Sequence, residues 1–201
     1  MQDIIWEVQR RSYSYHEFVA LTDQLLAEGK TTGTNHSEDY VAYTRINQQR
    51  THRVYKTTEI NAELKEALAQ LEGRYEWTVL VEAWCGDVSQ NLPVIAKAVE
   101  GIPNITLKNI LRDENLDVMN LYLTDGGKAI PKLIVRNQDS GEVVAIWGPR
   151  PEPAQAMIRA YKEMTEKPPY MEFVKTVQAW YNQDHTRTLQ AELLQLVRGL
   201  E

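Results

Sequence analysis

A change in hydrophobic periodicity near residue 76 constrains this chain more than any other feature of its sequence. Before it, apolar residues such as Phe18 and Leu21 recur at helical spacing. Residues 77–83 instead read Trp-Thr-Val-Leu-Val-Glu-Ala, a short apolar run that is typical of a buried strand. A helical pattern follows at residues 88–100, and a second strand-like run at residues 105–110. We therefore expect two parallel strands joined by a crossover helix.

The rest of the chain extends this core. Residues 131–136 and 142–147 are strand-like, and the turn-forming sequence Asn-Gln-Asp-Ser-Gly between them favours an antiparallel hairpin. Helical patterns occupy the chain on both sides, at about residues 14–29, 37–53, 58–73, 153–164, 171–182 and 186–200. The expected fold class is α/β, with a mixed sheet flanked by helices and further helices added at both ends.

We divide the chain into three parts on the same evidence. Residues 1–75 form a helical N-terminal extension, residues 76–165 the α/β domain, and residues 166–201 C-terminal helices packed on the core. Within the first helix, Ser14 and Glu17 have the spacing of a capping box. For the third helix, Thr58 is the expected N-cap.

Composition and charge exclude several classes of protein. The chain has 201 residues, 43% apolar and 25% charged, which excludes wholesale disorder, collagen and a coiled-coil rod. The net charge of −6 is spread evenly, so no basic half indicates a nucleic-acid partner. No apolar run is long enough to span a membrane, and the first seven residues lack a signal-peptide pattern. We expect a soluble cytoplasmic protein with no nucleic-acid or membrane partner, of undetermined oligomeric state.

Cys85 lies where the first strand passes into the crossover helix, and it is the chain's one cysteine. A single cysteine excludes an internal disulfide and a Cys-rich zinc site, and the four histidines lack ligand spacing, so we expect no metal or cofactor. Unpaired N–H groups at a helix N-terminus favour the thiolate. Gly86, beside the thiol, permits close approach of a partner. Taken alone, such a cysteine is more often a small buried apolar residue.

The residues around Cys85 resemble the thioredoxin superfamily, in which Trp-Cys-Gly-Pro-Cys lies between a central strand and its helix. Here residues 84–88 read Trp-Cys-Gly-Asp-Val. Ala-Ile-Pro at residues 129–131 resembles the family's cis-proline loop, and Trp-Gly-Pro at residues 147–149 its glycine turn after the last strand. More narrowly, the chain is similar to bacterial thioredoxin-like proteins of the Bacteroidetes type with helical extensions, here with a motif that lacks the second cysteine.

The resemblance implies a site in which Cys85 is the nucleophile. The residues expected to contact substrate are Trp84, Gly86, Asp87, Ile130 and Pro131. A cis peptide bond before Pro131 would leave backbone groups of Ile130 free to pair with an extended peptide, whereas the alternative is a simple edge-strand proline.

Three positions depart from the family pattern. Val88 stands where the resolving cysteine belongs, so a self-contained dithiol cycle is excluded. Asp87 replaces a proline. Its negative charge disfavours a thiolate at Cys85, although a carboxylate also suits the N-terminus of a helix as a cap. The direction of the net pKa shift of Cys85 therefore stays open. Glu82 is a tentative counterpart of the family's buried proton-transfer acid, although it lies closer to the cysteine; the alternative is an ordinary hydrogen bond or salt bridge.

Three functions remain open from the sequence. In the first, a monothiol thiol–disulfide oxidoreductase, Cys85 attacks a disulfide, a glutathione adduct or a peroxide, and an external protein or low-molecular-weight thiol resolves the product. In the second, a non-catalytic binding module uses the groove around Trp84 and Pro131 for a peptide or protein. In the third, the added helices mediate self-association.

A basic stretch at residues 41–58 has no acidic residue and contains three arginines, one lysine and two tyrosines. Such a stretch is usually the solvated face of a helix. The alternatives are a grip on RNA or an acidic partner, and an approach of the arginines to the thiol.

Overall fold

The predicted mixed sheet is the centre of the fold. The computed structural model describes residue 6 and residues 9–200. These residues form the strands β1 (Tyr75–Val81), β2 (Ile105–Leu111), β3 (Lys132–Asn137) and β4 (Val143–Trp147), in the order β2-β1-β3-β4. β1 pairs with β2 in parallel, while β3 is antiparallel to both β1 and β4. The α/β class, the crossover and the hairpin are confirmed. The first seven residues, in which we expect no signal peptide, lie outside the described part except for residue 6.

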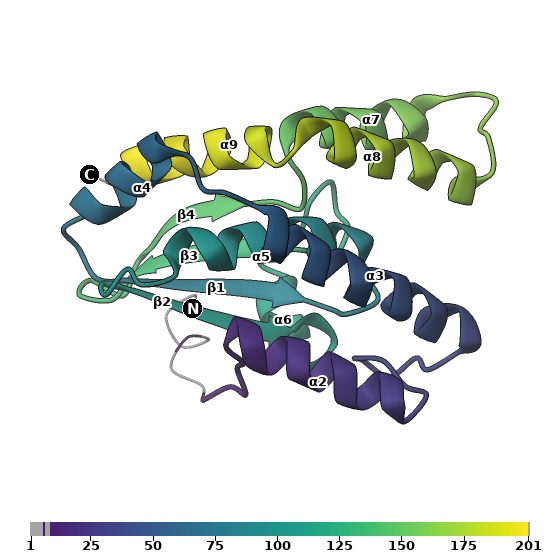
Figure 1. The fold of residues 1–201 in the computed structure, drawn as a ribbon, viewed down its shortest axis with the longest axis horizontal. Helices are drawn as coiled ribbons and strands as arrows, with labels where there is room; N and C mark the ends of the chain where they lie inside the picture. The colour runs from purple at the N-terminus through teal and green to yellow at the C-terminus, as the bar shows by residue number, and fades with distance from the viewer. Residues whose placement is uncertain (1–5, 7–8, 201) are drawn as a thin grey trace.

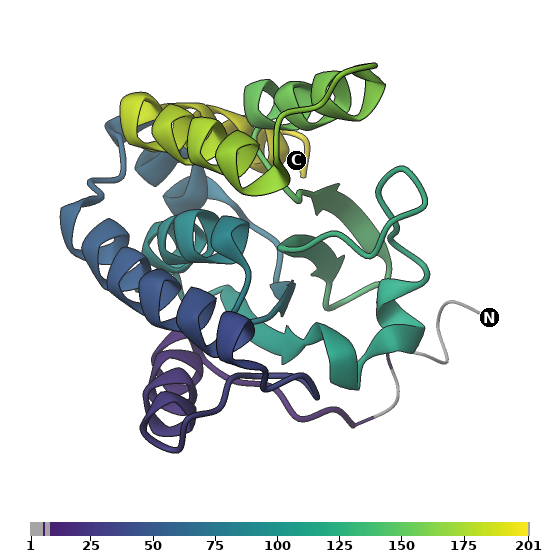
Figure 2. The same cartoon turned by 90° about the vertical axis from the view of Figure 1, so that its right-hand side faces the viewer.

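Helix α5 (Gly86–Val99) makes the crossover between β1 and β2 and is buried on all sides. From Asp87 to Val99, every residue except Lys97 is buried. A crossover helix usually keeps one polar face in water. Here α5 contacts α2 (Tyr15–Ala27), α3 (Glu38–Thr57), α4 (Ala62–Gln70) and α9 (Arg187–Arg198), which belong to the two extensions. Figures 1 and 2 show these helices gathered around α5 on one side of the sheet.

The C-terminal part runs along one edge of the molecule. Helix α7 (Glu152–Glu163) pairs with α8 (Tyr170–Asp184), and α9 pairs with α4, as the upper part of Figure 1 shows. Two short elements, η1 (Arg112–Glu114) and α6 (Leu116–Met119), lie between β2 and β3 in the sequence. No helix among the described residues is both long and apolar enough to cross a bilayer.

One apolar core joins the sheet to both extensions. Phe18 and Leu64 from the N-terminal part, and Leu193 from the C-terminal part, belong to the same buried cluster as the strand residues. A smaller cluster, which includes Phe173 and Tyr181, holds α7 and α8 together. The extensions are therefore packed elements of the fold.

The sequence predicts capping residues for two helices, and the structure confirms one of the two predictions. The capping box at Ser14 and Glu17 is confirmed. The predicted N-cap at Thr58 is wrong, because the N–H of Thr58 bonds to the carbonyl of Val54 and Thr58 is the C-cap of α3. The third helix begins at Ala62, where the Asn61 side chain accepts a hydrogen bond from the N–H of Leu64.

Candidate functional site

A cleft of about 740 Å³ opens between α3 and α8, with the N-terminus of α5 beneath it. Its apolar and aromatic lining includes Tyr40, Tyr43, Ile46, Trp84, Ile130, Ile158, Tyr170, Met171 and Val174. Its polar and charged lining includes Asn47, Arg50, Cys85, Asp87, Arg112, Lys128, Arg150, Lys175, Gln178 and Asn182. Helices from both extensions therefore wall the cleft, and the sheet domain supplies its floor.

Cys85 lies on this floor as the N-cap residue of α5. Its side chain is half-buried, and its thiol donates a hydrogen bond to the carbonyl oxygen of Ile130, with Sγ and O 3.3 Å apart. Burial raises the pKa of the Cys85 thiol to about 12, and the negative charge of Asp87 adds to that shift. The N–H groups of the helix N-terminus and the charge of Arg150 lower the same pKa, but by less. The thiol is therefore protonated at neutral pH.

The loop before β3 places Ile130 against the thiol. The Ile130–Pro131 peptide bond is cis in the structure. Ile130 lines the cleft, whereas Pro131 is buried behind it. The turn after β4 approaches this loop so closely that a Cβ on Gly148 would lie 2.4 Å from the Pro131 carbonyl oxygen. Gly148 also has a φ of +104°, so only glycine fits there without strain.

Asp87 is in the first turn of α5, but its side chain does not cap the helix. Its carboxylate pairs with Arg150 at 2.7 Å and accepts a hydrogen bond from the hydroxyl of Tyr181 at 2.9 Å. The Asn91 side chain in turn donates to the Tyr181 oxygen at 3.0 Å. These buried contacts tie α5 to α8 and to the segment after β4. Asp87 thus holds one wall of the cleft in place.

Gly86, next to Cys85 in the chain, lies close to side chains of both walls of the cleft. A Cβ on Gly86 would lie 3.2 Å from Nε2 of Gln178 in α8 and 3.7 Å from Nη1 of Arg50 in α3. Gln178 is held there by Gln90, whose Nε2 donates to its Oε1 at 2.8 Å. The absence of a side chain at Gly86 leaves room for these two side chains of the protein itself. The expectation from the sequence was that it leaves room for a partner.

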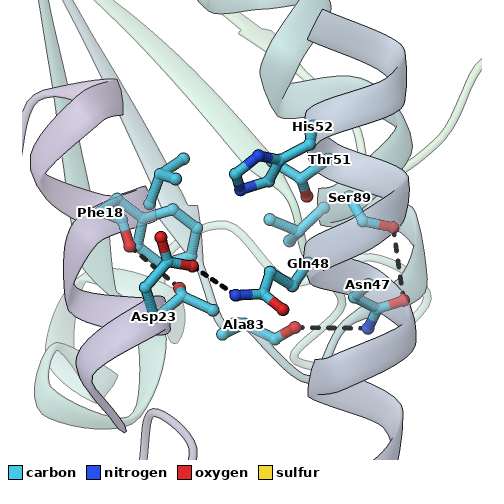
Figure 3. Close-up of a pocket in the computed structure, with 11 residues that line it drawn as sticks. Phe18, Asp23, Asn47, Gln48, Thr51, His52, Ala83 and Ser89 are labelled. Carbon is cyan, nitrogen blue, oxygen red and sulfur yellow. Dashed lines mark hydrogen bonds between the residues drawn. The ribbon is translucent and has the colours of Figure 1, made fainter. Parts of the chain in front are cut away.

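Asn47 ties α3 to Ala83, which follows β1, and to Ser89 in α5, as Figure 3 shows for a neighbouring, smaller pocket. Its Nδ2 donates to the carbonyl of Ala83 at 3.3 Å, and its Oδ1 accepts hydrogen bonds from Ser89 and, at 2.7 Å, from Nη1 of Arg50. The gap drawn there, between α2 and α3, has a volume of only about 10 Å³. We interpret it as a packing defect with no room for a ligand.

Trp84 forms part of the cleft's aromatic surface. Its ring centroid lies 5.2 Å from that of Tyr40, and the Arg112 guanidinium lies 4.7 Å from it. Arg112 also pairs with Asp113 at 2.7 Å, which fixes the guanidinium over the ring. Trp84 is half-buried, so part of it remains available to a ligand.

Glu82 is fully buried beneath a loop of the N-terminal extension. Its Oε1 accepts a hydrogen bond from the N–H of Asp113 at 2.9 Å, while its Oε2 has no hydrogen-bond partner among the described residues. Burial raises the pKa of Glu82 to about 7. A Cβ on Gly33 would lie 3.5 Å from Oε2. The charges that act most on the pKa of Cys85 are instead those of Asp87 and Arg150.

The structure brings most of the predicted site residues together and adds others. Cys85, Trp84, Gly86, Asp87 and Ile130 line one cleft, whereas Val88 is buried in the core at 3% exposure. Sequence reasoning missed several contributors, among them Arg150, Gln178 and Tyr181. For α8 no signal was available, because its residues are far from the motif in sequence. Arg150 follows the glycine turn directly, which is the one clue that the sequence offered.

The described residues contain no group of three His, Cys, Asp or Glu side chains arranged to hold a metal ion. The candidate site is therefore built from a thiol, paired charges and aromatic rings.

Comparisons with known proteins place this geometry in context. A family model described as Thioredoxin matches residues 33–165. Two solved structures are similar in fold: a protein of unknown function from Pseudomonas aeruginosa and an HIV epitope scaffold. The first has 20% identity and a TM-score of 0.57, and the match covers 94% of this chain and 99% of that one. The second has 21% identity and a TM-score of 0.56, with coverages of 88% and 97%. The comparison with curated proteins gives no match.

Proposed function

The chain belongs to the thioredoxin family, and from this premise we propose that it is a binding protein built on the thioredoxin fold. The cleft beside Cys85 receives a narrow ligand, either an extended peptide segment or a small organic molecule. Cys85 contributes to the floor of the cleft as a protonated thiol. Binding, in this proposal, does not depend on turnover of the thiol.

The position of the two extensions carries the proposal. Helices α3 and α8 stand on either side of Cys85, and the cleft between them has the size and the largely apolar lining of ligand sites in general. A disulfide on the surface of a folded protein cannot easily reach a thiol between two helices. A single extended chain or a small molecule can.

The chemistry around the thiol supports the same conclusion. The thiol donates to Ile130, its pKa is raised by burial and by Asp87, and no second cysteine exists to complete an exchange cycle. A thiolate is the reactive form in disulfide exchange, and little of it forms at neutral pH when the pKa is high.

Binding of the neutral dye Nile red, followed by its fluorescence, tests this proposal. The wild type should bind the dye in the apolar cleft, and Cys85→Ser should bind it equally well. Val174→Trp should weaken binding because Val174 lines the cleft, whereas Ile146→Trp, at an exposed position of β4, should not. Circular dichroism of each variant checks that it folds. Equal binding by the two tryptophan variants, or no binding by the wild type, would contradict the proposal.

A monothiol oxidoreductase is the second candidate, and one observation favours it. The backbone N–H groups of Asp87 and Val88, together with Arg150, all act to lower the pKa of Cys85. In that mechanism the Cys85 thiolate attacks one sulfur of a disulfide and releases the other as a thiolate. An external thiol then attacks the substrate sulfur of the mixed disulfide. It forms a disulfide with the substrate, and Cys85 leaves as a thiolate.

The pH dependence of Cys85 alkylation by iodoacetamide, followed by intact mass, separates the two candidates. We expect slow labelling at pH 7 and a midpoint well above about 8.5, the value of a free thiol. Fast labelling with a midpoint below pH 7 would favour the oxidoreductase instead. Because the chain has one cysteine, a single mass shift reports on this residue alone.

The three-part division of the chain and a cytoplasmic location belong to the same proposal. A lone half-buried thiol fits a compartment that keeps thiols reduced. The extensions, in this proposal, are the parts that convert a thioredoxin fold into a ligand cleft.

A further inference from the structure

The cleft carries more positive than negative charge. Its lining contains five cationic side chains, Arg50, Arg112, Lys128, Arg150 and Lys175, and one acidic side chain, Asp87. Two of these cations have acidic partners: Arg112 pairs with Asp113, and Arg150 with Asp87. Within the described part of the chain, no ion pair involves Arg50, although this residue is half-buried.

Arg50 is held in position rather than free to move. Its Nη1 donates to Oδ1 of Asn47 at 2.7 Å, and Asn47 is itself bound to the carbonyl of Ala83. The guanidinium comes within 3.7 Å of the Cβ position of Gly86, directly beside Cys85. Asp87, the nearby acid, is already bound by Arg150 and Tyr181. A guanidinium has five N–H donors, so most of the donors of Arg50 remain for a ligand.

Burial without an acidic partner is unfavourable for a cation, and a bound anion would compensate it. Desolvation lowers the pKa of Arg50 and the neighbouring Arg53 lowers it further, whereas the charge of Asp87, which Arg150 already pairs, raises it by less. A planar guanidinium matches the two oxygens of a carboxylate. The apolar side chains Tyr40, Ile158 and Val174 line the same cleft and would contact an apolar body.

We propose that Arg50 is the anchor for a carboxylate, and that the ligand of this cleft is an amphipathic carboxylic acid. The acid group pairs with Arg50 beside Gly86, and the apolar part lies between α3 and α8. This inference rests on the proposed binding function and adds the chemical class of the ligand. The carboxylate has two possible sources, a free organic acid or the C-terminus of a peptide.

Competition against Nile red tests the inference with two matched pairs of probes. The first pair is decanoate and decanamide; the second is acetyl-Leu-Leu-Phe with a free C-terminus and the same tripeptide as its C-terminal amide. In the wild type, the acid of at least one pair should bind about tenfold to hundredfold more tightly than its amide, the range expected for a charge-assisted hydrogen bond. The pair that shows this difference identifies the source of the carboxylate.

Two variants assign the effect to Arg50. Arg50→Gln should remove the preference for the acid while Nile red still binds. Arg53→Gln is the matched control: it removes the same charge one turn along α3, from a side chain that donates to Asn182, and should keep the preference. Equal binding of acid and amide in the wild type, or an equal loss in both variants, would overturn the inference while the binding function survives. A wild type that does not bind Nile red would overturn the binding function itself.

Discussion

Cys85 and Glu82 are three residues apart, and burial is the largest influence on the pKa of both side chains. The helix N-terminus acts on the thiol in the direction expected from sequence, but desolvation and the charge of Asp87 outweigh it. Periodicity does not reveal how deep a side chain lies, because depth depends on which helices cover it. At the residue scale, the pKa values of Cys85 and Glu82 therefore depend on how the surrounding helices and loops cover them.

Glu82 should make the stability of the protein depend on pH. Its pKa is about 7 in the folded chain against an ordinary 4.5, so between these values the folded state binds more protons than the unfolded state. The free energy of unfolding should fall as the pH rises from about 4.5 to 7, by about 3 kcal/mol for this group. Urea denaturation at several pH values, compared with Glu82→Gln, isolates this contribution.

Glu82→Gln keeps an oxygen to accept the N–H of Asp113 but has no charge to bury. It should be more stable than the wild type above pH 7 and should lose that advantage toward pH 5. Parallel stability profiles for the two proteins would contradict a titrating Glu82.

At the scale of elements, the strand ends and turns set the position of the floor. The turn after β4 contacts the loop before β3 at Gly148, where a Cβ would lie 2.4 Å from the Pro131 carbonyl oxygen. Neither backbone segment can yield without disturbing the sheet, since β3 and β4 are paired beside them. The residue before Pro131 in this loop, Ile130, accepts the hydrogen bond from the thiol of Cys85.

Gly148→Ala should strongly destabilise the protein. Both the positive φ and the clash with backbone act against alanine, and we expect a loss of more than about 2 kcal/mol in the free energy of unfolding. Gly126→Ala is the control, because Gly126 also has a positive φ, of +74°, but has nothing within 4 Å of its Cβ position. Similar losses in the two variants, measured by urea denaturation, would show that the backbone contact is unimportant.

At the scale of the whole molecule, the extensions and the sheet domain are connected through buried polar contacts as well as through the apolar core. Tyr181 links α8 to α5 by its bonds to Asp87 and Asn91, and Asn47 links α3 to the segment that follows β1. These contacts lie beneath the two walls of the cleft. They determine how far apart α3 and α8 stand, and therefore what can reach Cys85.

Tyr181→Phe should loosen one wall of the cleft. The change removes one hydrogen bond from each of Asp87 and Asn91, which keep their bonds to Arg150 and to the Asp87 carbonyl, and it should cost about 1–3 kcal/mol in the free energy of unfolding. With α8 held less firmly, iodoacetamide should alkylate Cys85 faster at a fixed pH. Tyr170→Phe is the control, because Tyr170 is 57% exposed. A variant that is destabilised but alkylated at the wild-type rate would show that α8 does not limit access to the thiol.

Much of this protein was predictable from local pattern. The β-rich runs, the helical runs and the turn between residues 136 and 142 determined the class of the fold, because strands and helices follow local hydrophobic spacing. The motif at residues 84–88 placed Cys85 at a strand-to-helix junction, and the structure has it there. The exclusion of a dithiol cycle also needed only the sequence, since Val88 carries no thiol.

The tertiary structure alone decided what surrounds the thiol. Arg50 and Gln178 are 128 residues apart in the chain, yet both come within 4 Å of the Cβ position of Gly86. Tyr181 reaches Asp87 across 94 residues of the chain. These contacts depend on how helices from the two ends of the chain pack on the sheet. That packing results from many contacts at once, and no single segment of the sequence determines it. The sequence by itself thus determined the fold class and the position of the cysteine, while tertiary packing determined the burial, the charge and the access of the site.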